Sequence, residues 1–155
     1  MTNERGQAAE TSTAAPERIE LEGLFTQMLG VWYPRHYMVA AIDPREGAAA
    51  VEALVSAGFD SDSVRLEGGA RVGRIRTAIY EQRTPLQRAA AAVSRALTDE
   101  GLMSQEYFEE ADGGASLIAV LAPEPALVAE GRRILAAHGA RHMRFYDDNC
   151  ITDLV

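Results

Sequence analysis

The 155-residue sequence contains a single cysteine, Cys150, and no lysine, so arginine accounts for all 15 residues of the Lys and Arg class. One cysteine excludes a framework of internal disulfides and is typical of proteins in a reducing cytoplasm. The sequence also lacks an apolar run of about 18 residues, which a membrane-spanning helix requires. Its N-terminus lacks the basic start and apolar centre of a secretory signal. We therefore expect a cytoplasmic protein without a transmembrane segment.

Positive charge is also scarce, because 23 acidic residues outnumber the 15 arginines and the formal net charge is -8. Nucleic acids and anionic membranes attract positively charged surfaces, so this balance argues against general binding to either. Hydrophobic residues nevertheless make up 47% of the chain. A chain of this length can bury a substantial core, and it is too short for two ordinary domains.

Two stretches, residues 37–66 and 115–146, carry the same pattern of a strand, a helix that ends at a glycine, and a second strand. Asp43 is typical of a residue that caps a helix start, and Gly58 and Gly139 are typical of helix ends. Two βαβ units predict an α+β fold: a ferredoxin-like duplicated βαβ sandwich, with a four-stranded antiparallel sheet and helices on one face.

The remaining segments differ from the repeats in composition. Residues 1–18 have little to bury and predict a disordered tail. Residues 19–34 predict an amphipathic helix and a linker that precede a single α+β domain over 35–155. Within that domain, residues 70–112 predict a helical insert between the repeats, and residues 147–155 a C-terminal tail that folds back onto the domain.

The insert contains arginines first and helical apolar patterns afterwards. We expect an arginine-rich connection over residues 71–83. Apolar residues at helical spacing then predict a helix from Thr84 to Leu97 and a shorter helix from Ser104 to about Ala111. This insert is the largest part of the domain that the repeat does not explain.

Polar and apolar side chains alternate in the last strand of the second repeat, so Met143 and Phe145 should share one face of the sheet. A sheet with helices on one face leaves its other face open, either to bind a small ligand or to be buried in a dimer. The candidate ligand-binding residues on that face are Tyr37, Arg65, His142, Arg144 and Tyr146.

Arginines gather in the insert. They could hold a phosphate or an acidic partner through bidentate hydrogen bonds, or they could form a solvated face that pairs with the chain's own carboxylates. Tyr80 is the only aromatic residue among them, so stacking on nucleic-acid bases has little support. The candidate anion or partner patch comprises Arg71, Arg74, Arg76, Arg88 and Arg95.

The predicted helix near the N-terminus has an apolar side that is followed by two aromatic residues. This side could cover one end of the sheet within the monomer, or it could dock on a second subunit or a protein partner. The candidate docking residues are Leu24, Phe25, Met28, Trp32 and Tyr33.

No group of residues predicts catalysis, a metal or a cofactor. His138 and His142 are four residues apart, but Gly139 should end the helix between them and separate their side chains. Cys150 lies among aspartates, whose negative charge opposes formation of a reactive thiolate. We therefore expect that the protein is not an enzyme.

The strand that precedes Asp43 and three further segments of the chain resemble the general stress, or heat-induced stress, protein family with a duplicated βαβ domain. The three further segments are AVEALVSAGFD (residues 50–60), GLMSQEYFEEADGGASLIAV (residues 101–120) and GARHMRFYDDNCITDL (residues 139–154). The family has no established catalytic residues, so the resemblance implies none here. The family's long glycine- and alanine-rich apolar segment is replaced by the arginine-bearing insert.

These observations lead to two hypotheses on function. The first is a non-enzymatic, stress-associated protein that acts through self-association, as a homodimer or a larger oligomer, or through a protein partner. The alternative is a sensor of a small anionic metabolite that uses the open sheet face or the arginine-rich insert.

Overall fold

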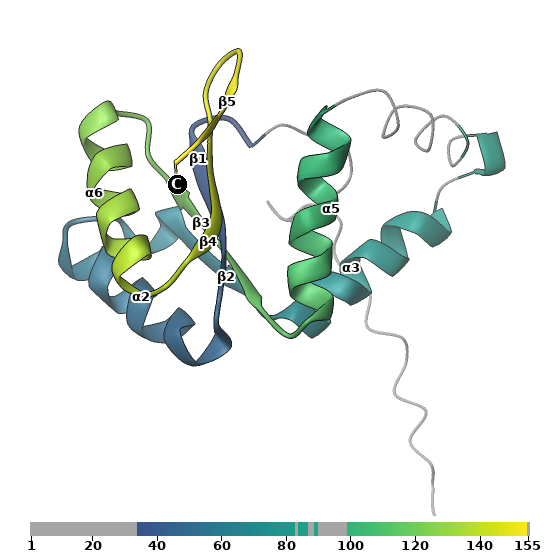
Figure 1. The fold of residues 1–155 in the computed structure, drawn as a ribbon, viewed down its shortest axis with the longest axis horizontal. Coiled ribbons are helices and arrows are strands. Elements are labelled where there is room, and N and C mark those ends of the chain that lie inside the picture. The colour runs from purple at the N-terminus through teal and green to yellow at the C-terminus, as the bar shows by residue number, and fades with distance from the viewer. Residues whose placement is uncertain (1–33, 83, 87–88, 90–98, 155) are drawn as a thin grey trace, which may run out of the picture.

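The computed structural model describes residues 34–82, 84–86, 89 and 99–154 of the chain (Figure 1). Its elements follow in this order: β1 (Tyr37–Ile42), α2 (Pro44–Ser56), the 3-10 turn η1 (Ser61–Ser63), β2 (Val64–Glu67), α3 (Gly69–Gln82), α5 (Asp99–Asp112), β3 (Ser116–Leu121), α6 (Pro125–Ala137), β4 (Arg141–Tyr146) and β5 (Ile151–Asp153).

The strands form one open sheet in the order β2-β3-β1-β4-β5, and all neighbours are antiparallel. The expected α+β class is therefore confirmed. The expected count of four strands is wrong, because β5 pairs with the outer side of β4. The backbone N–H of Asp147 donates to the carbonyl of Cys150 at 2.9 Å and closes the turn that returns the chain. The predicted C-terminal tail thus becomes an edge strand.

Helices cover both faces of the sheet, with α2 and α6 on one side and α3 and α5 on the other (Figure 1). The expectation of helices on one face only is wrong. Both faces are covered because of β1 and β3, in which residues 38–42 and 116–120 are buried without interruption. A strand that is apolar on both faces must be covered on both faces.

The sheet accordingly separates two cores. The first lies under α2 and α6, and it includes Met38, Ile42, Leu54, Ile118, Leu135 and Met143. The second core lies under α3 and α5, and it includes Val39, Ala41, Val72, Ile75, Tyr107, Ala111, Leu117 and Tyr146. Phe145 packs against the first core, so the prediction that Met143 and Phe145 share one face is confirmed.

The start of α2 and the ends of α2 and α6 follow the local sequence signals. The Asp43 carboxylate accepts a hydrogen bond from the backbone N–H of Arg45 at 2.9 Å and caps α2. Gly58 has φ of +105° and Gly139 has φ of +73°, backbone conformations that glycine adopts without strain. Both predicted helix ends are confirmed.

The prediction of an arginine-rich connection over residues 71–83 is wrong for residues 71–82, because these residues form most of helix α3. Val72 and Ile75 are three residues apart and face the second core, whereas Arg74 is exposed on the opposite side. The short helix predicted from Ser104 is present, but α5 begins five residues earlier, at Asp99. Pro85, Leu86 and Ala89 are helical, and the rest of the helix predicted to Leu97 lies outside the described residues.

Candidate functional site

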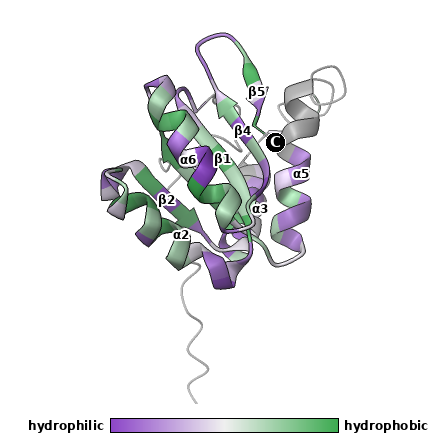
Figure 2. Cartoon of the chain, turned by 60° about the vertical axis from the view of Figure 1, so that its left-hand side comes forward, coloured by the Kyte–Doolittle hydropathy of each residue, from purple (hydrophilic) through white to green (hydrophobic). Residues whose placement is uncertain are grey.

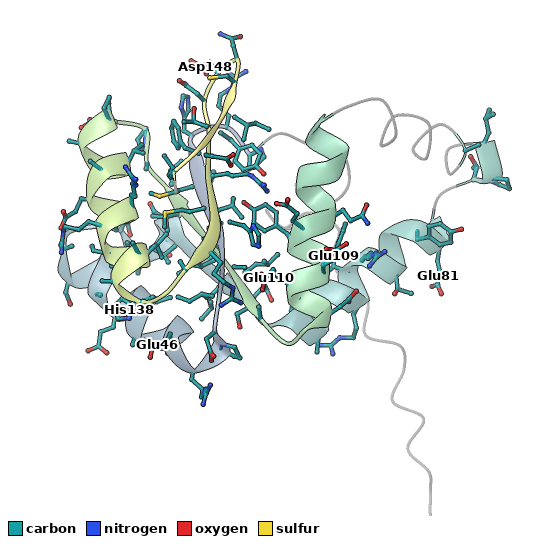
Figure 3. The ribbon with its side chains drawn as sticks, in the orientation of Figure 1. Glu46, Glu81, Glu109, Glu110, His138 and Asp148 are labelled. Carbon is teal, nitrogen blue, oxygen red and sulfur yellow. The ribbon has the colours of Figure 1, made fainter. Side chains whose placement is uncertain are left out.

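A cluster of linked charged and titratable side chains lies where α5 packs against β4. Glu106 and Glu110 project from α5, His142 and Arg144 from β4, and Asp153 from β5. We call these five residues the seam. Figure 3 shows Glu110 on the side of α5 toward the sheet and Glu109 on the side away from it.

Arg144 is the buried cation of the seam, with only 8% of its side chain exposed. Its Nε donates to a carboxylate oxygen of Asp153 at 3.0 Å, and its terminal nitrogen donates to Glu106. The guanidinium carbon also lies 5.4 Å from the centroid of the Tyr107 ring. Burial alone would lower the pKa of Arg144, but the hydrogen bonds to Glu106 and Asp153 outweigh it and raise the pKa. The residue therefore stays charged inside the protein.

His142 lies between two carboxylates of α5. Its Nε2 is 3.1 Å from Glu110 and its Nδ1 is 3.4 Å from Glu106. Glu110 also accepts two hydrogen bonds from Arg141, at 3.3 Å from Nε and 2.7 Å from the terminal nitrogen. The bonds from Arg141 hold the pKa of the Glu110 carboxyl below its usual value, against a smaller opposing effect of burial. Each charged group of the seam therefore faces an opposite or ionisable partner.

A β-bulge in β4 places His142 beside α5. Val39 pairs with Arg144 and Ala41 with Arg141, so one residue of β1 stands opposite two residues of β4. His142 has φ of +52°, which a residue with a side chain adopts only at a cost. Bulges bend a strand and redirect its side chains. The bulge is the reason why His142 meets two glutamates of a helix.

Tyr107 of α5 closes the gap that the bulge opens in the ladder. Its hydroxyl donates to the carbonyl of His142 at 2.7 Å and lies 3.2 Å from the carbonyl of Val39. The side chain is completely buried, and burial strongly raises the pKa of its phenol, so the hydroxyl keeps its proton for this bond. Nothing local in the sequence marks Tyr107, since its partners are 68 and 35 residues away.

Replacing Tyr107 with phenylalanine should lower the free energy of unfolding by about 1–2 kcal/mol, because the partly buried His142 carbonyl loses its donor. Urea denaturation followed by circular dichroism measures this change. Tyr37→Phe is the matched control, since the Tyr37 hydroxyl makes no hydrogen bond with the described residues. Equal effects of the two substitutions would contradict the role assigned to the Tyr107 hydroxyl.

The lowered pKa of Glu110 predicts a dependence of stability on pH. Its pKa is lower in the folded than in the unfolded chain, where it is near 4.5. The ionised carboxylate therefore stabilises the fold above about pH 4.5, and this contribution disappears as the pH falls through the folded-state value. The difference in free energy of unfolding between wild type and Glu110→Gln should shrink as the pH is lowered from about 7 to about 3.

Urea titrations across this pH range measure the difference, with Glu109→Gln as the control. Glu109 is exposed on the opposite side of α5 and makes no ion pair with the described residues. A difference for Glu110→Gln that stays constant with pH would show that the Glu110 charge does not stabilise the fold.

The five candidate ligand-binding residues do not form one group. Arg144 and Tyr146 are buried next to each other on β4, with His142 partly exposed beside them. Tyr37 packs against the same second core from β1. Arg65 lies exposed on β2, and β3 and β1 separate it from β4. The face that was expected to be open is covered by α3 and α5, and the Arg144 guanidinium is held by carboxylates of the chain.

Two arginines of the candidate patch, Arg71 and Arg76, lie beside carboxylates of the chain itself. Arg71 Nε lies 3.1 Å from Glu67, and Arg76 lies 3.5 Å from Asp112. The Arg76 guanidinium also lies 4.6 Å from the centroid of the Phe108 ring. Arg74 is exposed and makes no ion pair with the described residues. Arg88 and Arg95 lie outside them, as do the docking candidates Leu24, Phe25, Met28, Trp32 and Tyr33.

Groups of His, Cys, Asp and Glu that could hold a metal ion do not occur in the described part of the chain. His138 Nδ1 lies 3.1 Å from Glu46 and joins the end of α6 to the start of α2. Among the helices of the described residues, none has the length and apolar character to cross a membrane. No protein-family model, curated protein or solved structure matches this chain.

Proposed function

We propose that this protein acts without catalysis, as a stress-associated protein that binds other protein chains, either copies of itself or a partner. The association with stress rests on the sequence resemblance of residues 50–60, 101–120 and 139–154 to the general stress protein family. The proposed binding to protein chains rests on two features of the described residues: large apolar side chains are exposed, and the charged side chains of the seam are paired within the chain.

The observation that carries the proposal is the exposure of large apolar side chains outside the two cores. Leu86 is 80% exposed and Tyr80 is 54% exposed, and both belong to the insert. Leu66 of β2 is 37% exposed and Val55 of α2 is 41% exposed. The charged side chains of the seam, in contrast, are paired within the chain. Exposed apolar groups lose unfavourable contact with water when another chain covers them.

We also propose that β1-α2-β2 and β3-α6-β4 are the two halves of a ferredoxin-like duplication. Both β1 and β2 are antiparallel to β3, which lies between them. In the same way, β3 and β4 flank β1. The Phe59 N–H donates to Leu54 and the Ala140 N–H to Leu135, so both helices end in the same hydrogen-bonded turn.

Two measurements test the proposed function. Sedimentation velocity of the full chain should show association that increases with concentration. In parallel, tagged wild type and a Tyr80→Ser/Leu86→Ser variant are used to capture proteins from cells before and after heat stress. We expect a partner that wild type retains and the variant loses, while Arg74→Gln, which changes an exposed polar residue, retains it.

A strict monomer at all concentrations, together with identical proteins captured by wild type and the double variant, would overturn the proposal. Thermal-shift measurements with phosphorylated metabolites address the anion-sensor alternative. A stabilisation of the full chain that is abolished by Arg74→Ala would replace protein binding by metabolite sensing as the proposed function.

A further inference from the structure

β2 is the strand at one edge of the sheet. β2 pairs with β3 on one side, and no described strand lies on its other side (Figure 2). The unpaired N–H and C=O groups of an edge strand are a template for pairing with another chain. Which groups point outward follows from the hydrogen-bond pattern of the sheet.

The N–H of Ala122 donates to the carbonyl of His36, its directly opposite residue across the β1–β3 register. Hydrogen-bonded pairs alternate along an antiparallel ladder, so the even-numbered residues of β3 point to β1 and the odd-numbered ones to β2. Ala119 pairs with Arg65 and Leu117 with Glu67. The backbone groups of Arg65 and Glu67 therefore bond to β3, and those of Leu66 face the open edge.

Side chains of β2 alternate between the two faces of the sheet. Val64 belongs to the first core, and Leu66 lies against Gly47 of α2 on that same face. Arg65 and Glu67 consequently point to the opposite face. Arg65 is exposed and makes no ion pair with the described residues. The edge thus presents a positive, an apolar and a negative residue in succession, and the backbone groups of the central residue pair with no described strand.

We propose that two copies of this chain pair through antiparallel β2 strands, with the two-fold axis at Leu66. This rests on the proposed function in its self-association form. The two Leu66 residues would exchange both backbone hydrogen bonds, and their exposed side chains would cover each other. On the other face, Arg65 of each copy stands opposite Glu67 of the other. The segment from Arg65 to Glu67 is therefore complementary in charge to a second copy of itself, as an isologous interface requires.

Charge selects this register over its neighbours. A slip of one residue would place Leu66 of one copy opposite Arg65 or Glu67 of the other. The side chains of those two residues belong to the opposite face of the sheet. A slip of two residues would bring Arg65 opposite the Arg65 of the second copy, and like charges directly opposite each other are unfavourable. Glu67 is also 3.1 Å from Arg71 of its own chain, which orients the carboxylate on that face.

The test exchanges the charges. Arg65→Glu or Glu67→Arg alone should weaken self-association roughly tenfold, because each places like charges opposite each other twice. The combined Arg65→Glu/Glu67→Arg variant restores opposite charges at both positions, so its affinity should return toward that of wild type. An equimolar mixture of the two single variants should also associate, since every charge at position 65 or 67 then meets its opposite.

Sedimentation equilibrium from about 1 to about 500 µM covers the weak affinities of small interfaces. Arg74→Glu, with the same charge change away from the edge, should associate like wild type, and circular dichroism confirms folding of every variant. If wild type is a monomer at all concentrations, the β2 pairing is overturned. Binding of a protein partner through Tyr80 and Leu86 is a separate question, which the capture experiment with the Tyr80→Ser/Leu86→Ser variant answers. If the single and the combined charge variants all associate as tightly as wild type, the β2 pairing is overturned. The protein would then still self-associate, but through another surface.

Discussion

A Gly69→Ala variant is expected to lose about 3 kcal/mol of its free energy of unfolding, a large fraction of the stability of a domain of this size. Gly69 is buried at the start of α3, where that helix crosses the end of α5. A Cβ atom there would lie 2.4 Å from the carbonyl oxygen of Ala111 and 2.6 Å from that of Ala115. Backbone oxygens cannot rotate away, so α3 must shift from α5.

Gly68→Ala is the matched control, because a Cβ at Gly68 meets no atom within 4 Å. Its effect should stay within about 0.5 kcal/mol, the range of surface substitutions. Urea unfolding of both variants by circular dichroism gives the comparison. Helix propensity favours alanine over glycine by about 1 kcal/mol, so a neutral or stabilised Gly69→Ala protein would show that the α3–α5 contact can relax.

An Arg144→Met variant is expected to lose about 2 kcal/mol of stability, because methionine fills the space but breaks the charge-assisted hydrogen bonds to Glu106 and Asp153. Removing one member of a wholly buried ion pair costs about 3–5 kcal/mol. Here the loss should be smaller, since 44% of the Glu106 side chain and 70% of the Asp153 side chain are exposed to water.

The control is Arg74→Met, which removes the same charge from an exposed site of α3 and should change stability by less than about 0.5 kcal/mol. A double-mutant cycle of Arg144→Met with Glu106→Gln isolates the coupling between the two side chains, which we expect to be about 1 kcal/mol. An Arg144→Met protein as stable as wild type would mean that the hydrogen bonds of Arg144 do not stabilise the fold, and Arg144 would again be a candidate ligand-binding residue.

The features predicted correctly depend on residues close together in the chain. Asp43 caps α2 through a backbone group two residues away, and Gly58 and Gly139 end helices through turns of a few residues. Met143 and Phe145 share a face because side chains alternate along any strand. Interactions over such short distances are present in the sequence itself, and no knowledge of the fold is needed to recognise them.

The coverage of the second sheet face could have been predicted but was missed. The uninterrupted apolar runs of β1 and β3 are typical of strands that are buried on both sides. Val72 and Ile75 also mark α3 as a helix with an apolar side, although an arginine-rich connection was expected there. The many arginines of this segment drew attention away from the helical spacing of its apolar residues.

The sequence by itself determined the α+β class, the strand–helix–strand order within residues 37–66 and 115–146, and the positions at which the helices of these segments end. Only the tertiary structure decided that α5 covers β4, that Arg144 is enclosed by Glu106 and Asp153, and that Tyr107 bonds the bulge at His142. These contacts join residues that are 9 to 68 positions apart. Their partners are chosen by the strand order and by the packing of α5, neither of which is a local property of the chain.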